Sequence, residues 1–147
     1  MKILSFNICG LGGLAKHKSL RNLLVSLAPD LILLQETMTC SHPSILSFSK
    51  LRPGWEYCAV SSTGLSGGLL AAWNPSCFRV KAFKTTAGIL LKAQVRGSPQ
   101  VFTLLNCYGP YTNREQFWNL VDRGGLLNQP NLILAGDLNL TLNCSEI

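Results

Sequence analysis

Short apolar segments separated by glycine, proline and serine constrain the fold of this chain more than any other sequence feature. Such segments follow one another through the middle of the chain, at residues 55–61, 68–73, 78–85, 89–95 and 101–107. Each has the length of a strand, and short turns between strands are typical of antiparallel pairing between sequence neighbours. The middle of the chain is therefore predicted to form an antiparallel meander.

The start of the chain predicts a strand, a helix and a second strand. Residues 2–9 are rich in Ile, Leu and Phe, and residues 20–27 carry leucines at the i, i+3, i+4, i+7 spacing of an amphipathic helix. Pro29 ends that helix, because the residue before a proline avoids the helical region. Residues 31–34 are continuously apolar, which suits a parallel strand buried on both faces.

The last third of the chain predicts one more helix and one more strand. Thr112 and Glu115 match a capping box at the start of a helix, and Gly124 follows its end. Residues 132–135 form a last apolar strand. Together the elements indicate an α/β fold with a largely antiparallel sheet flanked by helices.

Composition favours an anionic partner and a reducing compartment. The net charge is +6, from 13 Lys and Arg against 7 Asp and Glu, which favours nucleic acid or an acidic membrane surface. Arg79 and Lys81 share one face of a predicted strand, either as a weak nucleic-acid-binding stripe or as a solvated face. The six cysteines form no CxxC pair, which indicates an intracellular, reducing location without a disulfide framework. No apolar run approaches the ~18 residues of a membrane span.

Four apolar strands end abruptly in polar residues that could carry chemistry. These residues include Asn7, Glu36, Tyr108, Asp137 and Asn139. Ligand sites in layered α/β folds form where strands end, so we expect these five side chains to converge in one cleft.

Only Glu36 and Asp137, among seven carboxylates, directly follow fully apolar strands. Burying a carboxylate beside a core is costly unless it is paired or binds a metal. Mg²⁺ is commonly held by one or two carboxylates, with water and substrate phosphate completing its shell. Metal-assisted phosphoester cleavage would therefore fit this pair, although a surface strand end or a helix cap would also account for Glu36.

Four motifs occur in this order along the chain: SFNICGL at residues 5–11, LQET at 34–37, NCYGP at 106–110 and GDLN at 136–139. Together they resemble the endonuclease/exonuclease/phosphatase superfamily, which includes DNase-like and apurinic-site nucleases. Residues 65–75 and 137–147 are in addition similar to endonuclease domains of plant LINE-type retrotransposons.

The resemblance implies the fold and a role for each site residue. The fold would be the N-terminal part of a four-layer α/β sandwich. Glu36 would be the carboxylate ligand of a divalent metal, usually Mg²⁺ or else Mn²⁺, and Asn7 would help to hold the metal site. Tyr108 would contact the scissile phosphate, Asp137 would orient or deprotonate the attacking water, and Asn139 would position the phosphate.

Two departures from the family pattern bear on activity. Cys9 stands where some family nucleases carry an acidic residue. The family's motifs also continue to an Asp-His pair, whereas this sequence stops at Ile147, and His17 and His42 lie elsewhere. Residues 1–147 are thus expected to be an incomplete domain, with much of the second sheet missing and an apolar sheet face exposed to self-association.

Three functions follow from these observations. The first is a Mg²⁺-dependent DNA endonuclease in a truncated copy that is inactive or weak, placed in the nucleus if it acts on chromosomal DNA. The second is a non-catalytic remnant with at most weak nucleic-acid binding. The third is a phosphatase or phosphodiesterase acting on a small or lipid phosphate. The basic charge favours DNA, and no stable protein partner is predicted.

Overall fold

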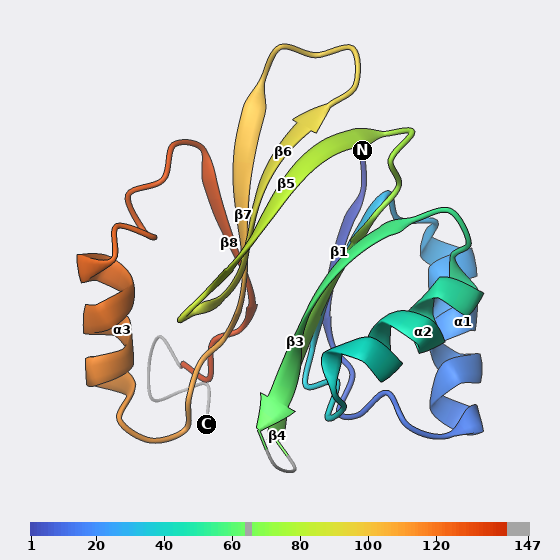
Figure 1. The fold of residues 1–147 in the computed structure, drawn as a ribbon, viewed down its shortest axis with the longest axis horizontal. Coiled ribbons are helices and arrows are strands. Elements are labelled where there is room, and N and C mark those ends of the chain that lie inside the picture. The colour runs from blue at the N-terminus through green and yellow to red at the C-terminus, as the bar shows by residue number, and fades with distance from the viewer. Residues whose placement is uncertain (64–65, 141–147) are drawn as a thin grey trace.

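Two four-stranded sheets form the framework of the fold, which the computed structural model describes over residues 1–63 and 66–140 (Figure 1). In the first sheet β1 pairs in parallel with β2, and β4 pairs antiparallel with both β2 and β3. Its strands, in spatial order, are β1 (Ile3–Asn7), β2 (Leu31–Gln35), β4 (Ser66–Trp73) and β3 (Glu56–Thr63).

The second sheet combines an antiparallel meander with one parallel strand. Strands β5, β6 and β7 pair antiparallel in sequence order, and β8 pairs in parallel with β7. The strands are β5 (Phe78–Thr85), β6 (Gly88–Val95), β7 (Val101–Tyr108) and β8 (Leu132–Asp137).

Helices cover the outer faces of both sheets and complete four layers (Figure 1). Helices α1 (Leu14–Leu27) and α2 (Ser41–Leu51) pack on the first sheet, where Leu24 and Phe48 are buried. Helix α3 (Arg114–Arg123) buries Val121 against the second sheet. This arrangement confirms the predicted α/β sandwich. No helix within the described ranges is long and apolar enough to cross a membrane.

The inner faces of the two sheets bury each other. Leu31 and Leu33 of the first sheet share one core cluster with Ile89, Leu91 and Leu104 of the second. All five are fully buried, as expected for two sheets that pack face to face. The expectation that one sheet is largely missing and leaves the other's inner face open is therefore wrong for the described residues.

The predicted single meander is also wrong, because it divides between the two sheets after β4. The turn at Asn74 begins the crossing: its side-chain oxygen accepts a hydrogen bond from the Ser76 amide at 3.0 Å, and its carbonyl accepts from the Phe78 amide at 3.0 Å. Packed sheets lie only about 10 Å apart, so a turn this short can serve a hairpin or a crossing between sheets.

Two local helix features differ from the sequence prediction. Helix α2 was not predicted, and it places His42 on its exposed first turn. The expected capping box of Thr112 and Glu115 does not cap α3. Instead the N-cap residue is Asn113, with a left-handed φ of 54° and no side-chain capping hydrogen bond.

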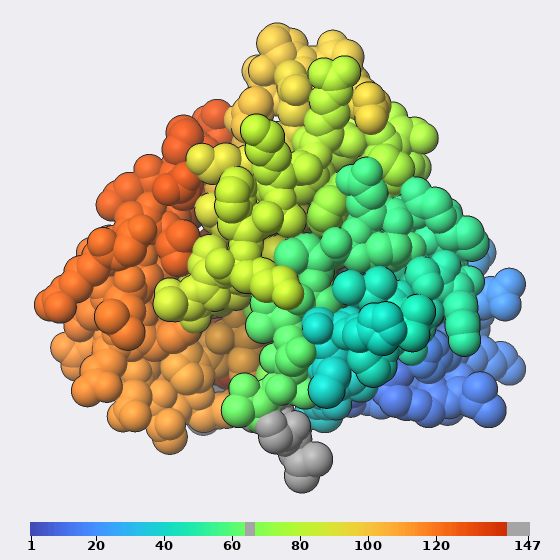
Figure 2. All heavy atoms as spheres, viewed as in Figure 1, coloured from blue at the N-terminus to red at the C-terminus, as the bar shows by residue number. Residues whose placement is uncertain are grey.

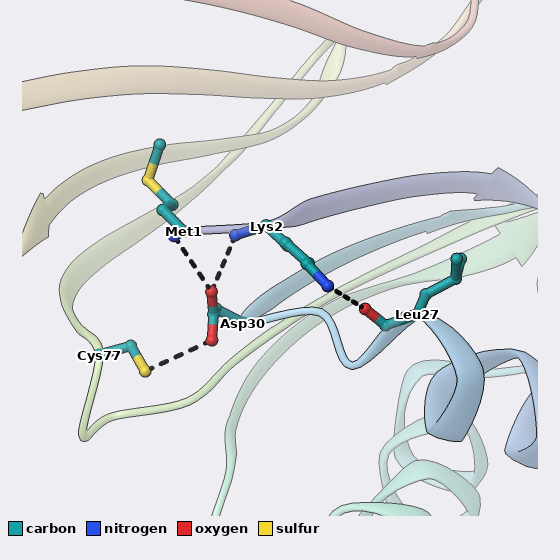
Figure 3. Close-up of polar contacts among 5 residues, drawn as sticks. All are labelled: Met1, Lys2, Leu27, Asp30 and Cys77. Atoms are coloured by element: carbon teal, nitrogen blue, oxygen red, sulfur yellow. Dashed lines mark hydrogen bonds and ion pairs between the residues drawn. The ribbon is translucent and has the colours of Figure 1, made fainter.

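Asp30 fixes the start of the first sheet at the end remote from the strand-end motifs (Figure 3). Its carboxylate accepts a hydrogen bond from the Lys2 amide at 2.8 Å and lies 3.7 Å from the amino group of Met1. The Cys77 thiol donates to the other carboxylate oxygen at 3.6 Å. This carboxylate therefore has a structural role.

Candidate active site

Two hydrogen bonds between the sheets bring four of the predicted site residues together. Asn7 Nδ2, at the end of β1, donates to Asp137 Oδ2 at 2.8 Å. The Tyr108 hydroxyl, at the end of β7, donates to Glu36 Oε1 at 2.5 Å. Tyr108 and Asp137 are also register partners across β7 and β8. The ends of β1, β2, β7 and β8 thus form one site.

The backbone around Glu36 is held in an unusual conformation. Glu36 has a positive φ of 52°, and its carbonyl accepts a hydrogen bond from the Gly10 amide at 2.6 Å. The next amide, of Thr37, donates to the Gly68 carbonyl at 3.1 Å. A Cβ on Gly68, in β4, would overlap the Thr37 hydroxyl, so this position requires glycine. Such strain persists only where the surroundings fix it, and it is concentrated at functional sites.

Asn139, the fifth predicted residue, lies beside Asp137. Its backbone amide donates to Asp137 Oδ1 at 3.0 Å, and its side-chain Nδ2 donates to the Gly109 carbonyl at 2.5 Å. Asp137 thus accepts hydrogen bonds on both carboxylate oxygens, from Asn139 and from Asn7. These contacts fix the orientation of the carboxylate.

The two carboxylates have no cationic partner within the described residues, whose single ion pair joins the N-terminus to Asp30. Glu36 is only 7% exposed, and a buried carboxylate without a countercharge is costly. In the same residues no three His, Cys, Asp or Glu side chains cluster as a closed metal site. One or two carboxylates with open positions fit Mg²⁺, which keeps several waters and binds substrate phosphate.

The Asn7 side chain is engaged by protein groups at both ends. Its side-chain oxygen accepts hydrogen bonds from the Cys9 amide at 3.0 Å and from the Cys9 thiol at 3.3 Å. Its side-chain nitrogen is engaged with Asp137. With both ends of its side chain occupied, Asn7 orients Asp137, and Glu36 is the residue that could hold a metal ion.

Tyr108 remains a neutral hydrogen-bond donor over the neutral pH range. Burial, followed by its hydrogen bond to Glu36, raises the pKa of Tyr108 well above the ordinary value of 10.0. The ring packs edge-on against Tyr111, with centroids 6.4 Å apart. A hydroxyl that keeps its proton suits a donor to a carboxylate or phosphate oxygen and not a base.

Gln35 and Asn106, which had no predicted role, join the two sheets beside the site. Both are almost fully buried between the sheets, and Gln35 Nε2 donates to Asn106 Oδ1 at 2.8 Å. Asn106 Nδ2 in turn donates to the carbonyls of Leu34 and Leu70, at 3.3 and 3.2 Å. Because Gln35 adjoins Glu36 and Asn106 is two residues before Tyr108, this pair sets the register of the two halves of the site.

Breaking the Gln35–Asn106 pair should destabilise the fold. We expect Asn106→Leu to lower the free energy of unfolding by about 2–3 kcal/mol, because the buried Gln35 amide loses one acceptor and the Leu34 and Leu70 carbonyls lose the Asn106 donor. Adding Gln35→Leu should cost about 1–2 kcal/mol less than the sum of the single variants, as measured by urea denaturation. Asn22→Leu, on the exposed face of α1, is the control and should change stability by less than about 0.5 kcal/mol. Strict additivity of the two core variants would contradict the pairing.

Neither the predicted phosphate-binding cations nor a histidine joins this site. Arg79 lies opposite Gln94, which lies opposite Val101 at the start of β7, whereas Tyr108 ends that strand. Lys81 is only two residues further along β5. The two histidines lie on α1 and α2. The structure thus separates Arg79 and Lys81 from the five strand-end residues.

Known structures share this architecture. The chain is similar to TDP2 from Caenorhabditis elegans, with 23% identity and a TM-score of 0.67 over 95% of this chain and 48% of that one. A mannosyl-6-phosphatase from Bacteroides thetaiotaomicron gives 13% identity and a TM-score of 0.74, over 99% and 68% of the two chains. An AP endonuclease from Leishmania major gives 19% and 0.63, over 95% and 55%. The chain thus spans about half the length of the TDP2 structure.

The sequence itself matches a family profile. No curated protein matches the chain. The profile of the Endonuclease/Exonuclease/phosphatase family, in contrast, matches residues 4–147, a range that includes every one of the strand-end residues described above. The chain therefore belongs to the endonuclease/exonuclease/phosphatase family.

Proposed function

We propose that this chain carries the metal- and phosphate-binding side of a Mg²⁺-dependent phosphodiester hydrolase that acts on DNA. The observation that supports the proposal best is the pair of hydrogen bonds, Glu36 to Tyr108 and Asn7 to Asp137, that crosses between the sheets. These hydrogen bonds bring two carboxylates and two neutral donors together at the strand ends. No cation of the described residues neutralises the two carboxylates.

Each residue has a distinct task in this proposal. Glu36 would hold the ion, which when bound would stabilise negative charge on the phosphate. Asp137, oriented by Asn7 and by the Asn139 amide, is placed to accept a proton from the attacking water. The Tyr108 hydroxyl, from the register partner of Asp137, and the Asn139 side-chain amide would position phosphate oxygens.

We further propose that residues 1–147 are an incomplete domain with little activity of its own. Similar solved chains are longer, since this chain covers between 48% and 68% of the three compared above. The described site also contains no histidine to assist at the phosphate. The sequence similarity at residues 65–75 and 137–147 supports an origin in a plant LINE-type retrotransposon, although residues 141–147 lie outside the described residues.

The substrate class is the second part of the proposal. Similar folds carry names as different as AP endonuclease and mannosyl-6-phosphatase. A net charge of +6 favours a polyanion such as DNA over a small sugar phosphate, because long-range attraction grows with the charge of the partner.

Mg²⁺-dependent binding of DNA tests the proposal without requiring turnover. We expect Mg²⁺ to strengthen binding of a fluorescein-labelled DNA duplex in fluorescence anisotropy. Glu36→Gln should abolish this effect, because it removes the carboxylate that would hold the ion. Glu115→Gln, on the exposed face of α3, removes the same charge and should keep the effect. Mannose 6-phosphate should not compete. Binding that Mg²⁺ weakens equally in all three proteins would contradict a metal-linked DNA site.

A further inference from the structure

The exposed side of β5 carries a row of basic and aromatic side chains. Arg79, Lys81 and Phe83 alternate with Phe78 and residues that pack into the inter-sheet core, so the three point away from that core. Arg79 and Lys81 are exposed, and the apolar ring of Phe83 is 45% exposed. Strand β5 is an edge strand, and Figure 2 shows its yellow-green atoms crossing the surface of the molecule.

The neighbouring strand adds positive charge where it is electrostatically unfavourable. Lys92 of β6 is the direct register partner of Lys81, and both are exposed. Like charges opposite each other across a strand pair destabilise a sheet. Arg96 follows in the β6–β7 turn and is also exposed. An anion bound over this face would relieve the repulsion.

No carboxylate of the described residues neutralises these cations. The single ion pair there is at the N-terminus, and Glu56 accepts a hydrogen bond from the Trp73 indole at 2.7 Å. Glu115 and Asp122 lie on α3 and form no ion pair with the row. The positive charge of this face therefore remains available to a partner.

A hollow of about 340 Å³ lies at the end of the row. Its lining includes Arg79, Gln94, Arg96 and Ser98. The Gln94 side chain donates to the Ser98 carbonyl at 2.8 Å, and Arg96 Nε donates to the Pro75 carbonyl at 2.5 Å. These two bonds hold the hollow's walls in place before any ligand binds.

We infer that Arg79, Lys81, Phe83, Lys92 and Arg96 form a second, metal-independent surface that binds single-stranded nucleic acid. A surface that combines cations with an exposed aromatic ring suits this ligand, because the cations contact the phosphates while a base stacks on the ring. Arg79 lies seven register positions from Tyr108 along β7, or about 23 Å. This surface goes beyond the proposed function, since it needs neither the metal nor the active site.

Oligonucleotide binding in the presence of a chelator tests this surface. We expect a labelled oligothymidine to bind in EDTA, and the double variant Arg79→Gln/Lys81→Gln to weaken binding at least tenfold. The slope of log K against log salt should become shallower by about 1.4, because each lost phosphate contact contributes about 0.7 on single strands. Lys18→Gln/Arg21→Gln, on the exposed face of α1, removes the same charge and should leave the slope nearly unchanged.

Two further variants test which side chains contribute to oligonucleotide binding. Phe83→Ala should weaken binding about tenfold through lost stacking, with the salt slope unchanged. Glu115→Gln, on the exposed face of α3, should bind oligothymidine in EDTA as the wild type does. Equal losses in the β5 and α1 double variants would overturn the surface, and so would binding to anionic lipid vesicles without binding to oligothymidine. Thermal unfolding followed by circular dichroism verifies that each variant is folded.

Discussion

The purified 147-residue chain is expected to leave supercoiled plasmid DNA almost entirely intact in Mg²⁺. Its nicking rate should be at least about 100-fold lower than that of a full-length AP endonuclease assayed beside it. Loss of one acid–base or charge-stabilising group typically costs about 10²–10⁴ in rate. The described site offers Glu36, Asp137 and neutral donors, while both histidines lie on helices α1 and α2. The DNA would also be positioned less accurately, because this chain covers only 48% of the similar TDP2 chain and would make fewer contacts with the substrate.

Controls decide what any residual nicking means. Slow nicking that EDTA stops and that Glu36→Ala and Asp137→Ala both remove would come from this site. Strong nicking with the same sensitivities would contradict the proposed low activity, while leaving the site intact. Nicking that survives both substitutions would contradict the site itself.

Gly136→Ala should be among the most damaging single substitutions in the chain. Gly136 has a φ of 130°, and a Cβ there would overlap the carbonyl oxygen of Cys107 on the neighbouring strand. Backbone strain and overpacking each cost about 1–3 kcal/mol, so we expect a loss of about 3 kcal/mol or more in unfolding free energy, measured in urea. Because Gly136 precedes Asp137, the shift should also break the contact with Asn7.

Gly125→Ala is the matched control. Gly125 has a positive φ of 68°, but nothing lies within 4 Å of a Cβ placed there. Its cost should be that of a left-handed residue alone, about 1–2 kcal/mol. Equal losses at Gly125 and Gly136 would show that the close approach of β8 to β7 does not limit stability.

The sequence predicted most strands, and the polar residues at which four of them end, because both leave local signals. An apolar run that stops at a polar residue marks the end of a strand, and Glu36 and Asp137 were placed at strand ends in this way. No local signal in the sequence indicates which of these residues contact each other. The contacts of Asn7 with Asp137 and of Tyr108 with Glu36 depend on how two sheets stack, and nothing local in the sequence sets that arrangement.

The features that the sequence did not predict either lack a local signal or have a signal that is equally compatible with another structure. Helix α2 is rich in serine, a weak helix former, and it is stabilised by the burial of Phe48, whose ring packs edge-on against Tyr57 at 5.8 Å. Asn106 has the sequence signature of a strand end, yet it lies fully buried between the sheets. The turn at Asn74 is equally compatible with a hairpin and with a crossing between sheets.

Binding of Mn²⁺, observed by NMR on the isotope-labelled chain, tests the central claim most directly, because it asks for a metal site and not for turnover. We expect Mn²⁺ to broaden the resonances of Glu36, Asn7 and Asp137 first. Mg²⁺ should reverse the effect, Glu36→Gln should abolish it and Glu115→Gln should leave it unchanged. Broadening that centres on α3, or that persists in Glu36→Gln, would contradict a divalent-metal site at the strand ends.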